Sequence, residues 1–335
     1  MALVDPSRRV GLDVNRSRNA AVTFRKQDDR HTGDMFSSSA RRGDTMEKIV
    51  DEFDSRPGSA TSLLRTILGV TVGRGPAWLS TSNIVTLMDA VGVADKPART
   101  ALARLKAKGH LVAQIDPTPG YVASERAGRV FARDILRYVR PRLMTDSDPW
   151  CLISFSVPEQ DRGLRHQLRR RLTWMGCGSV ANGLWICPAY MDDEVHEMVA
   201  ELGLTGQVTT FIVSEIHGET EPKVAVSRWW DFELARVLHD HFLRAHAEAM
   251  AAYATSPDPR TAFRGWTRAL DLWRPITYVD PALPSSLMSA DWPGTVSIPR
   301  FSELGDTLER PAGRFIEEVT GRRSALSAYR EGLPR

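Results

Sequence analysis

The sequence predicts an α+β fold in three parts, because three different patterns follow one another along its 335 residues. Residues 58–145 have the pattern of three short helices, a β-hairpin and a fourth helix, which is typical of a winged helix-turn-helix. Residues 146–217 have the strand-helix-strand-strand-helix-strand order of a ferredoxin-like domain. Residues 218–325 have helical periodicity only. Residues 1–57 are expected to be a mobile tail, with a short amphipathic helix near Asp44.

The composition is that of a globular protein without membrane-spanning segments. Hydrophobic residues make up 42% and charged residues 25% of the chain, so a sizeable core can form. The sequence has no run of about 18 apolar residues, which excludes a transmembrane helix. Cys151, Cys177 and Cys187 form no C-x-x-C pair, and their odd number fits a reducing compartment. We expect a cytoplasmic protein without disulfides or a zinc finger.

Charge is distributed unevenly along the chain. Residues 1–55 carry 10 basic and 10 acidic side chains, residues 56–145 carry 14 and 5, and residues 146–335 carry 20 and 26. A basic segment between a neutral and an acidic one is typical of a nucleic-acid-binding domain joined to a part with another role. The alternative is a solvated basic surface, and charge alone does not decide between the two.

Start and stop signals define three helices in the first part. Thr61 is expected to cap the first helix, and Ser80 or Thr81 to cap the second. The third helix is predicted over residues 95–108, with Gly109 closing it. A glycine-containing turn joins the last two helices, as in a helix-turn-helix.

A β-hairpin and a fourth helix follow. Residues 111–115 and 121–123 have the composition of strands, and the turn between them contains two prolines and a glycine. This hairpin corresponds to the wing. The fourth helix is predicted from about Ser124 to Tyr138, and Pro141 ends it.

The predicted third helix has two contrasting faces. At about 100° per residue, one narrow face is apolar and is expected to be buried. That face contains Ala98, Ala101, Leu102 and Leu105. The opposite face combines cations with small side chains, so the helix can approach DNA closely while arginine reaches phosphates or guanine edges. A solvated helix face is the alternative. The predicted DNA-binding residues are Lys96, Arg99, Thr100, Ala103, Arg104, Lys106 and Lys108.

The middle part is predicted from alternating strand and helix signals. The helices are expected over residues 160–175 and 192–202, and the strands over residues 150–157, 178–181, 184–187 and 208–213. This order also resembles the small nuclease-like fold of CRISPR adaptation, in which an acidic residue at the end of the first strand would hold a metal. The first strand here has no acid before Glu159, which argues against metal-dependent phosphodiester cleavage.

Arginines are interleaved with aromatic residues in the predicted helical part. Aromatics cluster at the start of an expected long helix near Trp229 and along a second helix around Trp266. Aromatics at helical spacing are more often core than ligand site. Arginines beside an aromatic wall nevertheless suit an anionic, partly apolar ligand such as an aryl-CoA thioester. The candidate effector-binding residues are Arg228, Trp229, Arg264, Arg268 and Arg274. The arginines could equally pair with Asp231, Glu233 or Asp271.

The sequence contains no recognisable catalytic or cofactor motif. His239, His241 and His246 form the one metal-like cluster, but on a helix His239 and His246 are two turns apart and His241 points away. Polar surface histidines without a metal are therefore expected. P-loop, G-x-G-x-x-G and Ser/His/Asp elbow patterns are all missing. We expect no catalytic residues, no cofactor and no enzyme activity.

Three ordered blocks of sequence indicate a family. They are residues 98–111 (ARTALARLKAKGHL), residues 165–178 with 183–188 (RHQLRRRLTWMGCG and GLWICP), and residues 280–284 with 291–294 (DPALP and DWPG). Together they closely resemble the PaaX-type repressors of phenylacetic acid degradation over about residues 58–320. The resemblance implies a winged helix-turn-helix, a ferredoxin-like middle domain and a helical C-terminal domain in a dimeric repressor. It also implies release from DNA by an acyl-CoA ligand.

The sequence therefore predicts a DNA-binding transcriptional repressor of a catabolic operon, with aromatic acid degradation as the expected pathway. Its expected partners are a double-stranded DNA operator, an acyl-CoA effector and a second copy of the chain. A homodimer is expected because two copies of the helix over residues 96–108 would read two operator half-sites. Two alternatives stay open: a ligand-independent architectural DNA-binding protein, and a nucleic-acid-processing enzyme built on the ferredoxin-like domain.

Overall fold

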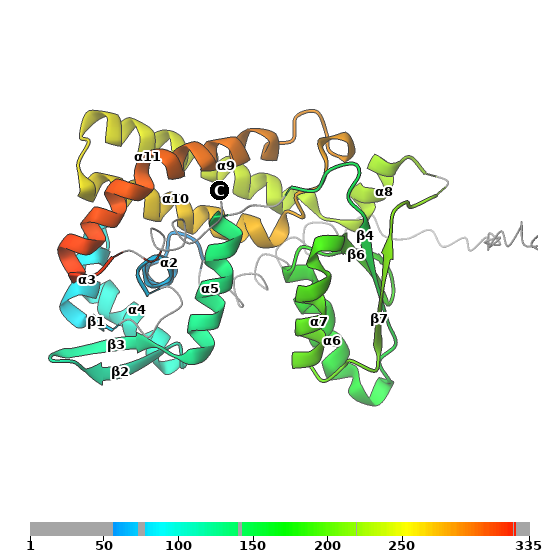
Figure 1. Ribbon diagram of the computed structural model, residues 1–335, viewed down its shortest axis with the longest axis horizontal. Coiled ribbons are helices and arrows are strands. Elements are labelled where there is room, and N and C mark those ends of the chain that lie inside the picture. The colour runs from blue at the N-terminus through cyan, green and yellow to red at the C-terminus, as the bar shows by residue number, and fades with distance from the viewer. Residues whose placement is uncertain (1–55, 73–77, 140–142, 219, 324, 326–335) are drawn as a thin grey trace, which may run out of the picture. The chain divides into compact units, whose positions relative to one another are not determined.

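The computed structural model describes residues 56–72, 78–139, 143–218, 220–323 and 325. Helices and two small β-sheets occur together in these residues, which confirms the predicted α+β class (Figure 1). Apart from its last two residues, the tail predicted over residues 1–57 lies outside the described residues, as does the helix expected near Asp44. None of the described helices is long and apolar enough to cross a membrane.

The first part consists of helices and a three-stranded sheet. Its elements are α2 (Ala60–Val72), β1 (Leu79–Ser80), α3 (Thr81–Ala90), α4 (Asp95–Ala107), β2 (Leu111–Ile115), β3 (Pro119–Ala123) and α5 (Glu125–Val139). The strands are antiparallel in the order β1-β3-β2. β3 begins two residues before its predicted start, because Pro119 pairs with Ile115 across the hairpin. A Cβ on Gly120 would lie 2.5 Å from the indole nitrogen of Trp78, so this strand position requires glycine.

Side-chain caps settle two predicted helix starts in this part. Ser80 is the N-cap of α3, because its hydroxyl accepts a hydrogen bond from Asn83 N at 3.0 Å. The prediction that Thr61 caps the first helix is wrong, since α2 begins one residue earlier and Thr61 is buried inside it. Ser59 has this role instead, because its hydroxyl accepts from Ser62 N at 3.3 Å.

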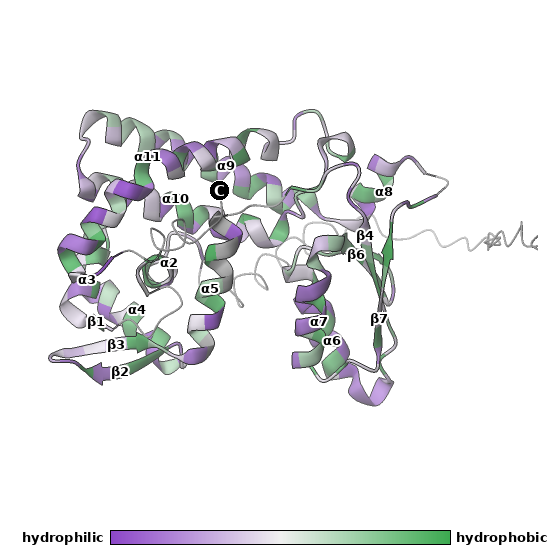
Figure 2. Cartoon of the chain, in the orientation of Figure 1, coloured by the Kyte–Doolittle hydropathy of each residue, from purple (hydrophilic) through white to green (hydrophobic). Residues whose placement is uncertain are grey.

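The middle part is a four-stranded antiparallel sheet with two helices. It contains β4 (Trp150–Phe155), α6 (Arg162–Trp174), β5 (Gly178–Ala181), β6 (Leu184–Pro188), α7 (Asp192–Glu201) and β7 (Val208–Val213). The strand order is β5-β6-β4-β7. Figure 2 shows hydrophilic and hydrophobic residues alternating along α6 and α7, as expected for helices that bury one face. The helix predicted from residue 160 begins at Arg162, because residues 159–161 form a 3₁₀ turn.

The C-terminal part is helical, as predicted, but the long helix expected to start near Trp229 is two helices. α8 (Pro222–Trp229) ends where Trp230 adopts an extended backbone with φ −119° and ψ 143°. α9 (Phe232–Thr255) then begins with Asp231 as its N-cap, whose carboxylate accepts from Glu233 N at 3.2 Å. α10 (Pro259–Val279) and α11 (Gly294–Thr320) complete this part.

One apolar core joins the first part to the C-terminal part. Leu64 and Leu87 belong to the same buried cluster as Phe263 and Trp273 of α10. The middle part has a core of its own, which includes all three cysteines as buried free thiols. The predicted domain boundaries stay predictions, but α4 is attached through the shared core to the C-terminal helices.

Candidate nucleic-acid interface

Helix α4 is well specified by its own residues. Alanine, the strongest helix former, recurs along it. Asp95 in its first turn and the cations Arg104 and Lys106 in its last turn match the helix dipole. Gly109 follows with φ at +72°, the left-handed conformation that favours glycine. The helix predicted over residues 95–108 is therefore confirmed to within one residue.

The two predicted faces of α4 are both present in the structure. The inner face packs on α2 and α3 and is at most 4% exposed. It consists of Ala98, Ala101, Leu102 and Leu105. All seven predicted DNA-binding residues are exposed, namely Lys96, Arg99, Thr100, Ala103, Arg104, Lys106 and Lys108. The helix thus presents cations and small side chains to solvent while its apolar side fixes it to the core.

The exposed cations of α4 differ in their partners within the chain. Arg99 Nε donates to both carboxylate oxygens of Asp95, at 2.9 and 3.0 Å. This hydrogen bond raises the pKa of Arg99 above its ordinary value. Among the described residues, no ion pair engages Lys96, Arg104 or Lys106. These three cations are therefore the ones most available to a partner outside the chain.

The hairpin that packs next to α4 offers a different kind of surface. β2 is exposed at every residue after Leu111, and Ile115 is 77% exposed. The segment from Leu111 to Ala123 contains no lysine or arginine. The hairpin thus offers no lysine or arginine side chain for contacts with phosphate.

Helix α10 contacts the end of α3, next to the turn that leads to α4. Arg264 Nε donates to the carbonyl of Ala90, the last residue of α3, at 2.8 Å. Arg260 forms an ion pair with Asp89 at 2.6 Å. Two side chains of the C-terminal part therefore hold the end of α3. Sequence reasoning missed both contacts, because the partners are 171 and 174 residues apart and no local pattern indicates them.

A buried charged network attaches α10 to α2. The carboxylate of Asp271 accepts from Ser62 Oγ at 2.6 Å and from Thr66 Oγ1 at 2.7 Å. It also accepts from the amide of Gly58 at 2.6 Å. Arg274 Nη2 donates to Ser62 Oγ at 2.8 Å and lies 3.4 Å from Asp271 Oδ1. Asp271 is 0% and Arg274 2% exposed. These hydrogen bonds hold α2 and α10 against each other.

The residues predicted to bind an effector occupy three different environments. Arg228 is exposed and Trp229 half-buried on α8, and Arg264 and Arg268 are exposed on α10. Arg274 is buried and forms an ion pair with Asp271, three residues earlier in α10. For Arg274 the structure thus bears out the alternative of an ion pair within the chain. A single site made of all five residues stays a prediction.

Two of the three clustered histidines are buried, so the expectation of polar surface histidines is wrong for His239 and His246. His239 Nε2 lies 2.8 Å from Asp280 Oδ2, and its Nδ1 lies 2.6 Å from Ser297 Oγ. These three residues have the composition of a catalytic triad, but Ser297 is fully buried within α11 and presents no nucleophile to a substrate. The described residues contain no group of three ligands that could hold a metal ion.

The fold and the exposed basic helix define the class of the protein. It is an α+β protein with three successive parts. The first part, made of helices and a hairpin, presents cations to solvent. A small antiparallel sheet with two helices and a helical part follow it. Three family models match successive segments: PaaX-like protein over residues 59–127, PaaX protein central Cas2-like domain over residues 145–225, and PaaX-like protein C-terminal domain over residues 230–318. The chain belongs to the PaaX family, which confirms the family resemblance of its three sequence blocks.

Individual proteins similar to the chain are known from two organisms. Over 253 residues the chain is 24% identical to Transcriptional repressor PaaX of Escherichia coli (strain K12), and the match covers 71% of this chain and 77% of that protein. The solved structure of Uncharacterized protein Rv0674 from Mycobacterium tuberculosis is 22% identical, with a TM-score of 0.43. That match covers 76% of this chain and 96% of the other.

Proposed function

We propose that this protein is a DNA-binding transcriptional repressor that uses α4 as its recognition helix. The contrast between the two faces of α4 carries the proposal: the inner face is at most 4% exposed, and the outer face consists of exposed cations and small residues. The E. coli protein that is similar over most of its length is named a transcriptional repressor, which supports the same function. In this proposal α2, α3 and α4 form a helix-turn-helix, and the hairpin of β2 and β3 is its wing.

The outer face of α4 contains cations that can reach DNA and small residues that let the helix approach it. Arg104 and Lys106 have no described ion-pair partner within the chain, so their charged ends are available to phosphates and guanine edges. Thr100 and Ala103 keep the helix backbone close to the groove. Arg99 is already paired with Asp95, and that carboxylate repels phosphate. We therefore expect Arg104 to contribute more to DNA binding than Arg99.

We further propose that two copies of the chain bind one operator in the cytoplasm. One copy presents a single α4, and a symmetric pair of recognition helices reads two half-sites about one helical turn of DNA apart. The middle part, with its strand order β5-β6-β4-β7, fits the ferredoxin-like scaffold proposed for it. That scaffold by itself indicates no activity.

We propose an acyl-CoA as the ligand that releases the repressor, and a catabolic operon for aromatic acids as its target. The family resemblance supports this proposal, and Arg264 offers a physical route. Arg264 belongs to the proposed effector contacts and also binds the carbonyl of Ala90 at the end of α3. An anion that draws its guanidinium away would loosen the turn before α4 and favour a state with lower DNA affinity. Arg228, Trp229 and Arg268 are the other proposed contacts, whereas Arg274 is already engaged with α2.

Selection of DNA by the full chain tests the repressor function. The chain should enrich one sequence from a pool of random duplexes, and that sequence should contain two inverted half-sites about 10 base pairs apart. The reason is that a symmetric dimer places two copies of α4 on one face of the DNA. Enrichment of a single half-site would contradict the dimer, and failure to enrich any sequence would contradict the function.

The effector proposal is tested with the enriched duplex. An aryl-CoA thioester should lower the affinity of the chain for this duplex and raise its melting temperature, because it binds the native state. The free aromatic acid should do neither, since it lacks the phosphates that arginine recognises. Gel-shift titration and thermal melting measure both effects. If the thioester leaves DNA binding unchanged, the ligand-independent architectural protein is the better description.

A further inference from the structure

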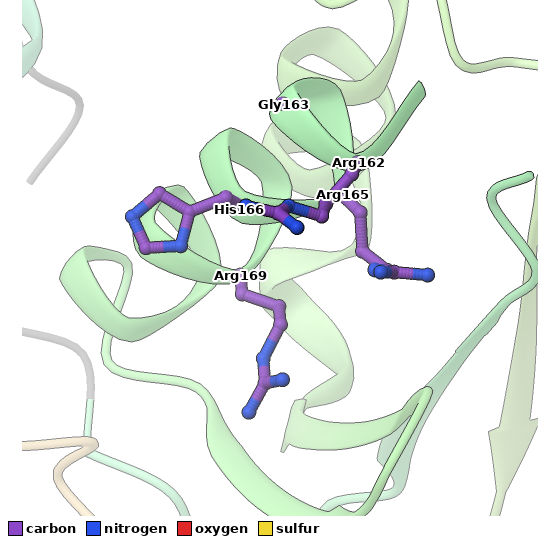
Figure 3. Close-up of a pocket in the computed structure, with 5 residues that line it drawn as sticks. All are labelled: Arg162, Gly163, Arg165, His166 and Arg169. Carbon is purple, nitrogen blue, oxygen red and sulfur yellow. The ribbon is translucent and has the colours of Figure 1, made fainter. Parts of the chain in front are cut away.

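Helix α6 in the middle part carries a cationic face that the proposed function does not use. Arg162, Arg165, His166 and Arg169 follow the spacing i, i+3, i+4 and i+7, so they lie along one side of the helix. With Gly163 they line an open depression of about 510 Å³. Figure 3 shows the side chains of Arg165, His166 and Arg169 reaching away from the helix backbone. The 13 residues of α6 include no acid.

Two of the three arginines on this face are less engaged than the other arginines of the same helix. Arg171 pairs with Glu201 at 2.5 Å, and the guanidinium of Arg170 lies over the Trp174 ring at 4.8 Å. In contrast, Arg162 and Arg169 are exposed, and no ion pair joins either of them to another described residue. Arg162 and Arg169 are therefore the α6 arginines most available to a partner outside the chain.

Arg165 and His166 complete this face. Arg165 is 34% exposed and has one ion pair, with Glu159 at 2.8 Å. His166 is exposed. Glu159 offsets the charge of one of the three arginines, so the net charge of the face stays positive.

Packing does not require these cations. The buried side of α6 includes Leu168 and Leu172, which are both 0% exposed in the core of the middle part. From Arg162 to Arg169 the helix rises only about 10 Å, at 1.5 Å per residue. Like charges this close repel one another unless an anion lies between them. The face is therefore suited to a ligand with several negative charges in a row.

We propose that the α6 face binds the backbone phosphates of duplex DNA. One strand of DNA carries a phosphate about every 3.4 Å along the helix axis, so a row of cations about 10 Å long matches about three phosphates. A free nucleotide would need an apolar or aromatic wall for its base, and of the five lining residues only His166 carries a ring, which is exposed. The contact adds affinity without sequence preference, since phosphates carry no sequence information. The proposal rests on the proposed DNA-binding function.

A charge-matched pair of variants tests the α6 face in the full chain. The first variant is Arg162→Gln/Arg165→Gln/Arg169→Gln. The control is Arg244→Gln/Arg310→Gln/Arg314→Gln, which removes three exposed arginines from α9 and α11. Fluorescence anisotropy with a mixed-sequence duplex measures the association constant K over a range of salt. The slope of log K against log salt should decrease in magnitude by about two to three in the α6 variant, because each lost phosphate contact removes about 0.9. The control should keep the wild-type slope.

The same measurements separate failure of this proposal from failure of the proposed function. If the α6 variant keeps the wild-type slope while Lys96→Ala/Arg104→Ala loses affinity for the selected duplex, the α6 contact is wrong and the repressor function stands. If the α6 variant instead loses binding of adenosine diphosphate and keeps its slope for DNA, the face is a nucleotide site and the proposal is overturned. If the wild-type chain shows no salt-dependent DNA binding, the proposed function itself fails. Arg169→Gln alone, with an expected slope change of about 0.9, serves if the triple variant does not fold.

Discussion

Arg104 of α4 and Arg274 of α10 have opposite environments and, we infer, opposite roles. Arg104 is exposed on α4, with no ion-pair partner among the described residues. Arg274 is 2% exposed on α10 and donates to Ser62, close to Asp271. The first charge is available to a partner outside the chain, and the second holds two parts of the chain together. Burial and partners, rather than residue type, separate a binding arginine from a structural one.

The structural role of Arg274 is tested most directly by replacing its buried partner, Asp271. Replacing Asp271 with alanine should lower the free energy of unfolding by about 3–5 kcal/mol, because it leaves the buried Arg274 without its carboxylate. It also leaves the hydroxyls of Ser62 and Thr66 without their acceptor. Urea unfolding of the full chain measures this loss.

A double variant provides the control for that experiment. Asp271→Leu/Arg274→Met removes both charges and fills the same space, so it should recover part of the lost stability. Wild-type stability in Asp271→Ala would show that the network does not hold α2 on α10.

A smaller effect is expected from His246 in the C-terminal part. Burial lowers the pKa of His246 below its usual value of 6.5, although the nearby carboxylate of Glu303 acts in the opposite direction and Arg300 adds to the lowering. The unfolded chain therefore takes up this proton first as the pH falls. Stability should be unaffected by this group above about pH 6.5 and should decrease below it, down to the lower pKa of the folded state. His246→Gln should reduce that dependence. Melting temperatures of the wild type and the variant between pH 5 and 7.5 measure this pH dependence. The same dependence in both proteins would contradict the assignment of the effect to His246.

Local signals in the sequence were sufficient for most helices and strands. The strand over residues 208–213 has the predicted bounds, and α4 differs by one residue. The inner and outer faces of α4 were also predictable, because helical periodicity and charge are both properties of a short segment. Thr61 was misassigned as a cap because Ser59, which is as good a capping residue, lies two positions earlier.

The contacts between distant segments could not be predicted from the sequence. Asp271 and Ser62 are 209 residues apart, and nothing local to α10 indicates that its carboxylate meets hydroxyls of α2. For the same reason the burial of Arg274 and His239 was missed. Charge at helical spacing shows which groups share a face, whereas the fold decides whether that face is solvent, core or ligand site.

The affinity of Arg104→Ala for the selected duplex tests the central claim most directly. The control is Arg310→Ala, which removes an exposed arginine from α11. Both variants should melt close to the wild-type temperature, since each replaces a surface side chain. Arg104→Ala should weaken DNA binding roughly ten- to a hundredfold, the range for one lost base or phosphate contact, and Arg310→Ala should bind like the wild type. Wild-type affinity in Arg104→Ala, or an equal loss in both variants, would contradict the assignment of α4 as the recognition helix.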